Sequence, residues 1–250
     1  MLLLGIGYST GERSSYDVAL DDAEAYLASL GVDTGLPLLS VEYKKGAWGA
    51  KYHIQGGEQL STHGNVKLSE QPLVEWVGGK DANGNANKYS VMMIDPDYPQ
   101  RATEDGSMAG AEGPSLHWFA LNCQESTGKT DYSCHQLRQY RGPDPADGTG
   151  DHRYILLLLQ QLRPPPKSSI ITDYLLKMGN PFDLQGFLDA LDGSMEVRAI
   201  NFFYANSVRD PEALEGPKSI PPPPPAPVTD GPSRSLGPKW QTPLPGHDEL

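Results

Sequence analysis

Apolar residues occur along most of this chain in short runs that Gly, Pro, Asn and Asp interrupt. Such runs are typical of β-strands, and we predict strands at 38–43, 72–77, 88–95, 116–123, 152–161 and 196–206. Two of them contain an unbroken apolar stretch, Val91–Ile94 and Leu156–Leu159. A strand without polar alternation is expected where both faces of a sheet are covered. We therefore place these two strands in the interior.

A helical spacing of apolar residues is found in three segments, 15–30, 169–178 and 183–192. The segment "GGKDANGNANK" (78–88) has the composition of a loop. Strands and helices do not alternate regularly, which favours an antiparallel β-sandwich with a few peripheral helices over a parallel sheet. The fold class predicted from the pattern is mainly β.

The composition changes near residue 211, where proline becomes abundant. Such a segment favours solvated polyproline II and buries too little apolar surface to fold, so we predict a disordered tail. The expected organisation is an N-terminal segment at 1–14, a domain at 15–210 and the tail at 211–250. The first segment lacks a basic start. It is interpreted as the remnant of a signal peptide, unless the signal is missing or the C-terminal motif described next is accidental.

Charge and motifs limit the location and the partners. The net charge of −12 disfavours nucleic acid and anionic membrane as non-specific partners, and no apolar run has the roughly 18 residues of a transmembrane helix. The last four residues, His247–Leu250, read HDEL. This motif predicts retention in the lumen of the endoplasmic reticulum by the HDEL receptor, with a cytoplasmic location as the alternative.

The two cysteines, Cys123 and Cys134, leave two interpretations open. In an oxidising compartment they can close a short disulfide loop, and in a reducing one they are unrelated thiols. The sequence has neither a CxxC pair nor an HxxxH pair, so it offers no structural zinc site.

Candidate chemistry gathers where three predicted strands begin or end. Asp95 and Asp97, in "DPDYP" (95–99), follow the first apolar run. His117 lies in "LHWFALN" (116–122), and His152 lies in "GTGDHRY" (148–154). Each residue alone suits a turn or a structural hydrogen bond. Two acids and two imidazoles at the mouths of buried strands indicate one convergent site.

These three motifs, in this order, resemble the phosphatidylethanolamine-binding protein family. That family includes the Raf kinase inhibitor proteins, the plant flowering-time regulators and the fungal carboxypeptidase inhibitors. "LSVEY" (39–43) and the closing segment 182–206 match more loosely, and the resemblance spans about residues 15–207. It implies an antiparallel β-sandwich with a small anion pocket at one end, which accepts phosphate or phospholipid head groups. The implied ligand-binding residues are Asp95, Asp97, His117, Gly148, Gly150, His152, Tyr154 and Tyr204.

We expect Asp95 to order its own loop, and Asp97 to lie at the rim and tune His117 or His152. A protonated imidazole donates two hydrogen bonds, so binding should strengthen as the pH falls from about 8 to about 6. Asp151 and the acidic loop at 100–115 add negative charge near the mouth, which weighs against an anionic ligand.

The function expected from these observations is non-enzymatic binding of a phosphate-bearing ligand or head group, without a cofactor, to regulate a protease or a signalling protein. The sequence has no nucleophile elbow, P-loop or dinucleotide motif. One alternative is inhibition of a serine carboxypeptidase, with residues 1–35 contributing to the contact. The other is a metal-dependent hydrolase, in which the two acids and two histidines hold a divalent ion that activates water.

Overall fold

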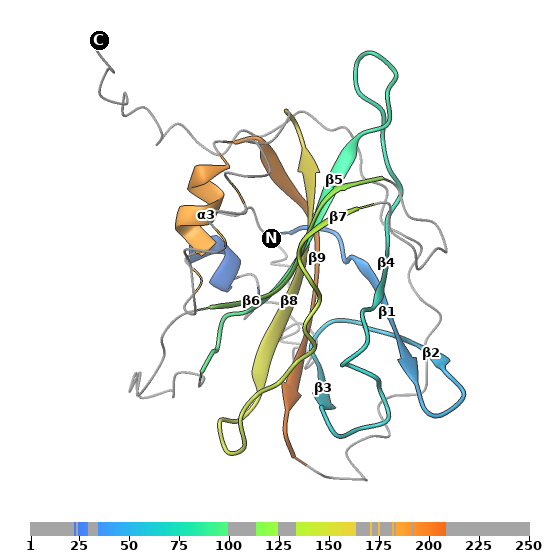
Figure 1. Cartoon of the computed structure of the whole chain (residues 1–250), viewed down its shortest axis with the longest axis vertical. Coiled ribbons are helices and arrows are strands. Elements are labelled where there is room, and N and C mark those ends of the chain that lie inside the picture. The colour runs from blue at the N-terminus through green and yellow to red at the C-terminus, as the bar shows by residue number, and fades with distance from the viewer. Residues whose placement is uncertain are drawn as a thin grey trace, which may run out of the picture.

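The protein is a β-sandwich with a helix against its outer face (Figure 1). The computed structural model describes residues 23, 25–29, 35–99, 114–124, 134–163, 171, 175, 182, 184–191 and 193–208. The larger sheet has the order β3-β9-β8-β5-β6-β7, with strands Glu58–Ser61, Met195–Asn206, His152–Gln161, Lys88–Asp95, Ser115–Cys123 and His135–Arg138. The smaller sheet has the order β2-β1-β4, with strands Ala50–His53, Ser40–Lys45 and Leu73–Glu75.

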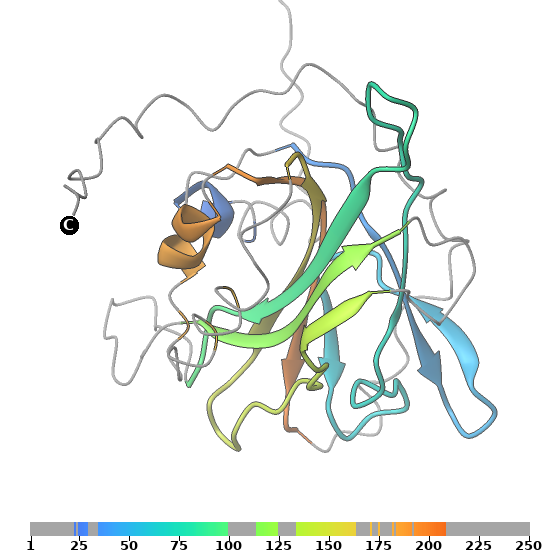
Figure 2. The same ribbon diagram turned by 45° about the horizontal axis from the view of Figure 1, so that its top comes forward.

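The central strands β5 and β8 are covered on both faces, as their unbroken apolar runs predicted. Alternate residues of each strand enter two separate clusters of buried side chains. Val91, Met93, Leu156 and Leu158 pack between the two sheets, whereas Met92, Ile94, Leu157 and Leu159 pack under helix α3 (Leu184–Ala190). Figure 2 shows the larger sheet between this helix and the smaller sheet. The two buried faces fix the register of both strands.

Three strands were not predicted, namely β2, β3 and β7. Their sequences, AKYH, EQLS and HQLR, are short, largely polar and partly exposed. They therefore lack the apolar signal on which strand prediction depends. One of them, β3, pairs in parallel with β9, so the larger sheet is mixed although its other pairs are antiparallel.

A β-bulge interrupts β6 at His117. Met93 of β5 pairs with Trp118, but the next residue, Ile94, pairs with Leu116. His117 is therefore an extra residue of β6 without a partner position on β5, and such an insertion changes the direction in which its side chain points. Without the bulge, strict alternation would place His117 on the same face as Phe119, under the helix. With the bulge, its ring lies against Tyr154 on the face between the sheets.

The side chain of Asn201 joins the two layers. Its Nδ2 donates hydrogen bonds to the carbonyls of Leu39, at 2.7 Å, and Ile54, at 3.0 Å. Its Oδ1 accepts from the backbone N–H of Phe202. All three interactions are buried, so this one amide satisfies backbone groups that water does not reach.

Several predictions lie wholly or partly outside the described residues. Of the helix predicted at 15–30, residues 23 and 25–29 are described, and they are helical. Residues 171 and 175 of the second predicted helix are helical too. The segment 1–14, most of the acidic loop at 100–115 and the tail at 211–250 lie outside the described part. No helix among the described residues is long and apolar enough to span a membrane.

The structure pairs Cys123 and Cys134 in a disulfide, with the sulfur atoms 2.13 Å apart. Cys123 is fully buried at the end of β6, and Cys134 directly precedes β7. The bond therefore links two neighbouring strands of the larger sheet where they begin and end.

Candidate functional site

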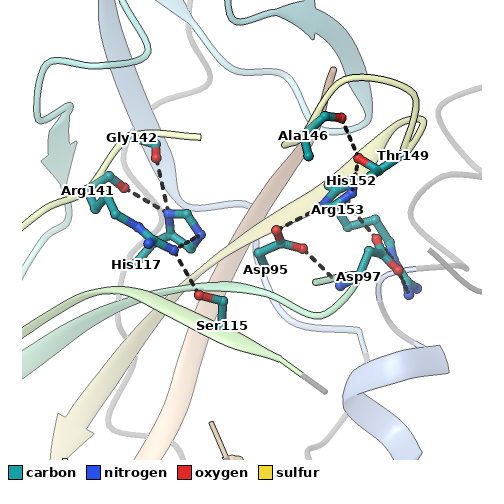
Figure 3. A network of polar contacts seen from close by, with 10 residues as sticks. All are labelled: Asp95, Asp97, Ser115, His117, Arg141, Gly142, Ala146, Thr149, His152 and Arg153. Carbon is teal, nitrogen blue, oxygen red and sulfur yellow. Dashed lines mark hydrogen bonds and ion pairs between the residues drawn. The ribbon is translucent and has the colours of Figure 1, made fainter. Parts of the chain in front are cut away.

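The ends of three neighbouring strands bring the predicted site residues together. Asp95 ends β5, His117 lies near the start of β6, and His152 and Tyr154 lie at the start of β8. Because β5 runs antiparallel to both neighbours, its end lies next to their beginnings. All four side chains are almost completely buried. Figure 3 shows the polar network around them.

Asp95 connects the turn after β5 to β8. One carboxylate oxygen, Oδ1, accepts a hydrogen bond of 2.9 Å from the backbone N–H of Asp97. The other, Oδ2, lies 2.9 Å from Nδ1 of His152. Asp95 thus orders its own loop, as expected, and it also makes the contact with a histidine that we had assigned to Asp97.

His152 is placed to donate from both ring nitrogens. The hydroxyl of Thr149 donates to the carbonyl of Ala146 at 2.7 Å, so the same oxygen can accept from Nε2–H of His152, 2.9 Å away. The other nitrogen faces the Asp95 carboxylate (Figure 3). A hydroxyl provides a single proton, so the Thr149 oxygen is left as the acceptor in its contact with His152.

Asp97 is engaged by Arg153 rather than by a histidine, which makes our prediction for its role wrong. Its Oδ1 lies 2.7 Å from Nη2 of Arg153, and its Oδ2 accepts from Nε at 2.9 Å and from the backbone N–H at 2.8 Å. This is a two-pronged carboxylate–guanidinium pair, the strong geometry for such ions. The guanidinium also lies 5.5 Å from the ring centre of Tyr26. Asp97 is therefore a structural partner.

His117 is held as a neutral ring. Its Nδ1 lies 3.0 Å from the carbonyl of Arg141 and 3.2 Å from that of Gly142. Carbonyls only accept, so Nδ1 carries the proton. Its Nε2 lies 3.2 Å from Nη2 of Arg141, which only donates, so Nε2 must be the acceptor.

The electrostatics agree with this assignment. Burial, followed by the positive charge of Arg141, lowers the pKa of His117 from 6.5 to about 4. The ring therefore stays uncharged throughout the range from about pH 6 to about pH 8. His117 therefore cannot supply the protonated imidazole on which the expected pH dependence of binding rests, because the neighbouring guanidinium already contacts its acceptor nitrogen.

Tyr154 provides a buried hydroxyl that forms no hydrogen bond of good geometry with any of the described residues, although the Asp95 carboxylate and the backbone of Asp144 lie near it. Its ring is fixed on both sides, edge-on to His117 at 5.2 Å and stacked on Phe203 at 5.6 Å. Burial and then the nearby Asp95 carboxylate raise its pKa well above the usual range. The group therefore remains a protonated O–H donor, and a buried unpaired donor is costly and rare.

The other predicted residues have different settings. Tyr204 packs with the cluster on the helix side of the larger sheet, whereas Tyr154 packs between the sheets. Gly148 and Gly150 have φ values of 80° and 82°, and a Cβ on either would meet nothing within 4 Å. These glycines are thus required by the turn before β8, and not by a close neighbour.

The carboxylate of Asp151 is engaged by two neutral amides. Its carboxylate accepts hydrogen bonds from the side-chain amides of Gln59, at 3.2 Å, and Asn206, at 2.5 Å. Both partners belong to the β3–β9 edge of the sheet. The charge is directed toward these amides.

Sequence reasoning missed Arg141, Ser115 and Thr149. The guanidinium of Arg141 donates to Ser115 Oγ at 2.9 Å as well as contacting His117. Arg141 is 24 residues from His117 in sequence and belongs to no recognised motif. The sequence signal that could have identified Arg141 is its position directly before Gly142-Pro143, in the segment that leads to the His152 motif.

Within the described ranges, no group of three or more His, Cys, Asp or Glu side chains is arranged to hold a metal ion. The two acids of the predicted metal site are instead directed to His152 and to Arg153. The described geometry therefore gives the hydrolase interpretation no ligand set.

The sequence profile of the phosphatidylethanolamine-binding protein family matches residues 50–203. The chain belongs to this family. The matched segment contains the described site residues from Asp95 to Tyr154, so the family assignment and the strand-end cluster concern the same part of the molecule.

Relatives and solved structures extend this result. A 26 kDa secreted antigen of Toxocara canis is 31% identical over 108 residues, which are 43% of this chain and 35% of the relative. A phosphatidylethanolamine-binding protein of Plasmodium falciparum, so described provisionally, is 29% identical over 39% of this chain and 44% of its own length. The chain thus spans less than half the length of these curated relatives.

One solved structure, a carboxypeptidase Y inhibitor in complex with its cognate proteinase, matches 78% of this chain and 95% of its own. Its TM-score is 0.52 at 21% sequence identity, which supports the shared fold. Together with the family assignment, it agrees with the mainly β sandwich predicted from the strand pattern.

Proposed function

We propose that this protein is a non-enzymatic binding module for a phosphate-bearing small ligand or phospholipid head group, and that the bound module regulates a partner protein. The observation that carries the proposal is the fully buried hydroxyl of Tyr154, which has no hydrogen bond of good geometry within the part of the chain that the structure describes. A donor without an acceptor favours a ligand that brings one. Phosphate oxygens are strong acceptors.

The charges around this hydroxyl support an anion. Both acids of the turn are paired, Asp95 with His152 and Asp97 with Arg153. Their negative charge is therefore largely compensated before a ligand arrives. The exposed Arg141 adds a positive charge close to His117 and Ser115.

The same contacts favour binding over catalysis. The ring of His117 is neutral, with both nitrogens occupied, and the carboxylate of Asp95 is directed to His152 and its own turn. A general base must reach the proton that it removes. In the described arrangement these groups hold each other, which suits a rigid receptor.

The test compares the wild type with Tyr154→Phe, which removes the hydroxyl and keeps the ring packed against His117 and Phe203. We expect phosphate and phosphoethanolamine to cause saturable NMR shifts at His117 and His152 in the wild type. The variant should bind at least about tenfold more weakly, the effect of losing one hydrogen bond to a charged group. Its thermal stability should not fall, because the hydroxyl has no partner to lose.

The matched control is Tyr140→Phe. The hydroxyl of Tyr140 donates to the carbonyl of Leu68 at 2.6 Å, and it lies 3.0 Å from the hydroxyl of Tyr43. This variant should lose stability and retain binding. Unchanged affinity in Tyr154→Phe, or silent histidines in the wild type, would show that the cluster is only structural.

A second candidate is inhibition of a serine carboxypeptidase, favoured by the match to the carboxypeptidase Y inhibitor over 78% of this chain. The segment expected to contribute, residues 1–35, lies largely outside the described residues. Deleting residues 1–14 and assaying serine carboxypeptidases with both forms tests this candidate. Negligible inhibition by both forms would eliminate it.

We also propose that the module acts in the lumen of the endoplasmic reticulum, where the HDEL receptor would retain it. The support is the HDEL motif at 247–250 together with the Cys123–Cys134 disulfide. Removing residues 247–250 from a chain that enters the secretory pathway should cause its secretion. Equal retention of both forms would contradict this location.

A further inference from the structure

Arg141 contacts both nitrogens of His117 through different parts of one residue. Its backbone carbonyl accepts from Nδ1 at 3.0 Å, and its Nη2 lies 3.2 Å from Nε2. The backbone N–H of Arg141 also donates to the carbonyl of His117 at 2.8 Å. The arginine therefore has a fixed position relative to the bulge of β6.

The guanidinium of Arg141 has donors to spare, and its side-chain partners among the described residues carry no charge. Among the described residues, its side-chain partners are Ser115 Oγ and His117 Nε2, both neutral acceptors that Nη2 contacts. The neighbouring Arg153, in contrast, is paired with Asp97. A guanidinium has five N–H donors. Arg141 is exposed as a residue, so its remaining donors can reach a ligand that arrives from solvent.

The same charge acts on the other site groups. It lowers the pKa of His117 and opposes the rise in the pKa of Tyr154. These effects require the guanidinium to lie within electrostatic reach of both rings, which are themselves in edge-on contact at 5.2 Å. An anion that accepts from the Tyr154 hydroxyl would therefore be attracted by Arg141.

We propose that Arg141 anchors the anion of the ligand and determines the specificity of the site, acting in place of a protonated His117. The inference rests on the proposed function, since it assigns the cation that this function requires. The guanidinium then selects ligands that carry a phosphate group, because its planar set of donors matches two oxygens of one phosphate. Ser115 and His117 position Arg141 and do not themselves carry charge to the ligand.

The experiment measures binding by calorimetry with two probes, inorganic phosphate and glycerophosphoethanolamine, the soluble phosphodiester of the lipid head group. Arg141→Gln is the main variant, because the amide removes the charge and keeps N–H donors on a shorter, uncharged side chain. We expect affinity to fall about tenfold to 100-fold, the range for a hydrogen bond to a charged group. Arg141→Lys keeps the charge without the planar fork and should lose less.

The matched control is Arg138→Gln, which removes an equal charge from an exposed residue of the adjacent strand β7. It should bind like the wild type. The ¹⁵N shifts of the His117 ring provide a second readout, since they report its tautomer. They should be the same in Arg141→Gln and in the wild type when no ligand is present.

The outcomes separate the two proposals. Wild-type protein that binds neither probe would overturn both the proposed function and the role of Arg141. Wild-type binding with undiminished affinity in Arg141→Gln would overturn only the role of Arg141. Weaker binding together with an altered His117 tautomer would also overturn it, because the arginine would then act through the ring. Equal losses for both probes support recognition of any phosphate, and a loss confined to glycerophosphoethanolamine supports a lipid head group.

Discussion

At the scale of single residues, the site is defined by which atoms donate and which accept. His117 shows this most directly, because two carbonyls and one guanidinium determine its tautomer and its neutral charge. The sequence predicted that His117 belongs to the site. It could not predict the neutral state, since that depends on Arg141, which approaches only in the folded chain.

The first prediction concerns the titration of His117. NMR should show that its ring gains a proton near pH 4, where the lowered pKa lies, and not near the unperturbed value of about 6.5. Between these values the unfolded chain binds more protons than the folded chain, so stability falls as the pH decreases. From about pH 7 to about pH 5 we expect a loss of about 2 kcal/mol from this group.

The control for this prediction is His117→Asn, which keeps an N–H donor near the Nδ1 position and cannot titrate. Urea unfolding at the two pH values should give a smaller loss in this variant than in the wild type. Identical pH dependence in both proteins would show that another group is responsible.

Gly142 provides a second prediction at this scale. A Cβ at this position would lie 2.5 Å from the carbonyl oxygen of Leu68 and 2.8 Å from Cα of Ser69, both backbone atoms that cannot rotate away. Gly142→Ala should therefore cost about 1 to 3 kcal/mol in the free energy of unfolding and disturb the carbonyl that faces His117. Gly84→Ala, which meets no atom within 4 Å but has a φ of 81°, separates this clash from backbone strain. A cost for Gly142→Ala no larger than that for Gly84→Ala would contradict the steric argument.

At the scale of elements, apolar patterning located the interior strands and missed the peripheral ones. The ranges 88–95 and 152–161 agree with β5 and β8 because the residues that fill both clusters adjoin in sequence. The strands β2, β3 and β7 depend on backbone pairing with a neighbour, which leaves no apolar pattern. The bulge at His117 could not be predicted from the apolar pattern either. It explains how a histidine among apolar residues turns toward Tyr154.

Burial of β8 on both faces predicts that its successive leucines are equally important. The side chains of Leu156 and Leu157 belong to different clusters. Replacing either one by alanine should lower the free energy of unfolding by about 2 to 5 kcal/mol. A strand with one solvated face would tolerate every second substitution. Denaturant unfolding provides the measurement, with Leu162→Ala as the control, since Leu162 is 43% exposed just beyond the strand. A small effect at either buried position would contradict the two-sided packing.

At the scale of the whole molecule, the two sheets are held together by apolar packing and by Asn201. Replacement by alanine would leave the carbonyls of Leu39 and Ile54 without the donor that serves them. We expect Asn201→Ala to cost more than about 2 kcal/mol in thermal or chemical unfolding, because unsatisfied buried carbonyls are costly. Asn85→Ala, in an exposed loop, should change stability by no more than about 0.5 kcal/mol. Equal effects of the two substitutions would show that Asn201 does not link the layers.

The order of strands in the larger sheet also has a consequence for motion. Asp95, His152 and Tyr154 belong to β5 and β8, which lie inside the sheet, while β3 and β7 form its edges. Amide hydrogens of inner strands exchange with solvent mainly when the whole domain unfolds, whereas edges open locally. The site therefore has no hinge of its own on these strands. A ligand would enter and leave past the loop before β8, and deuterium uptake should change there on binding while β5 stays protected.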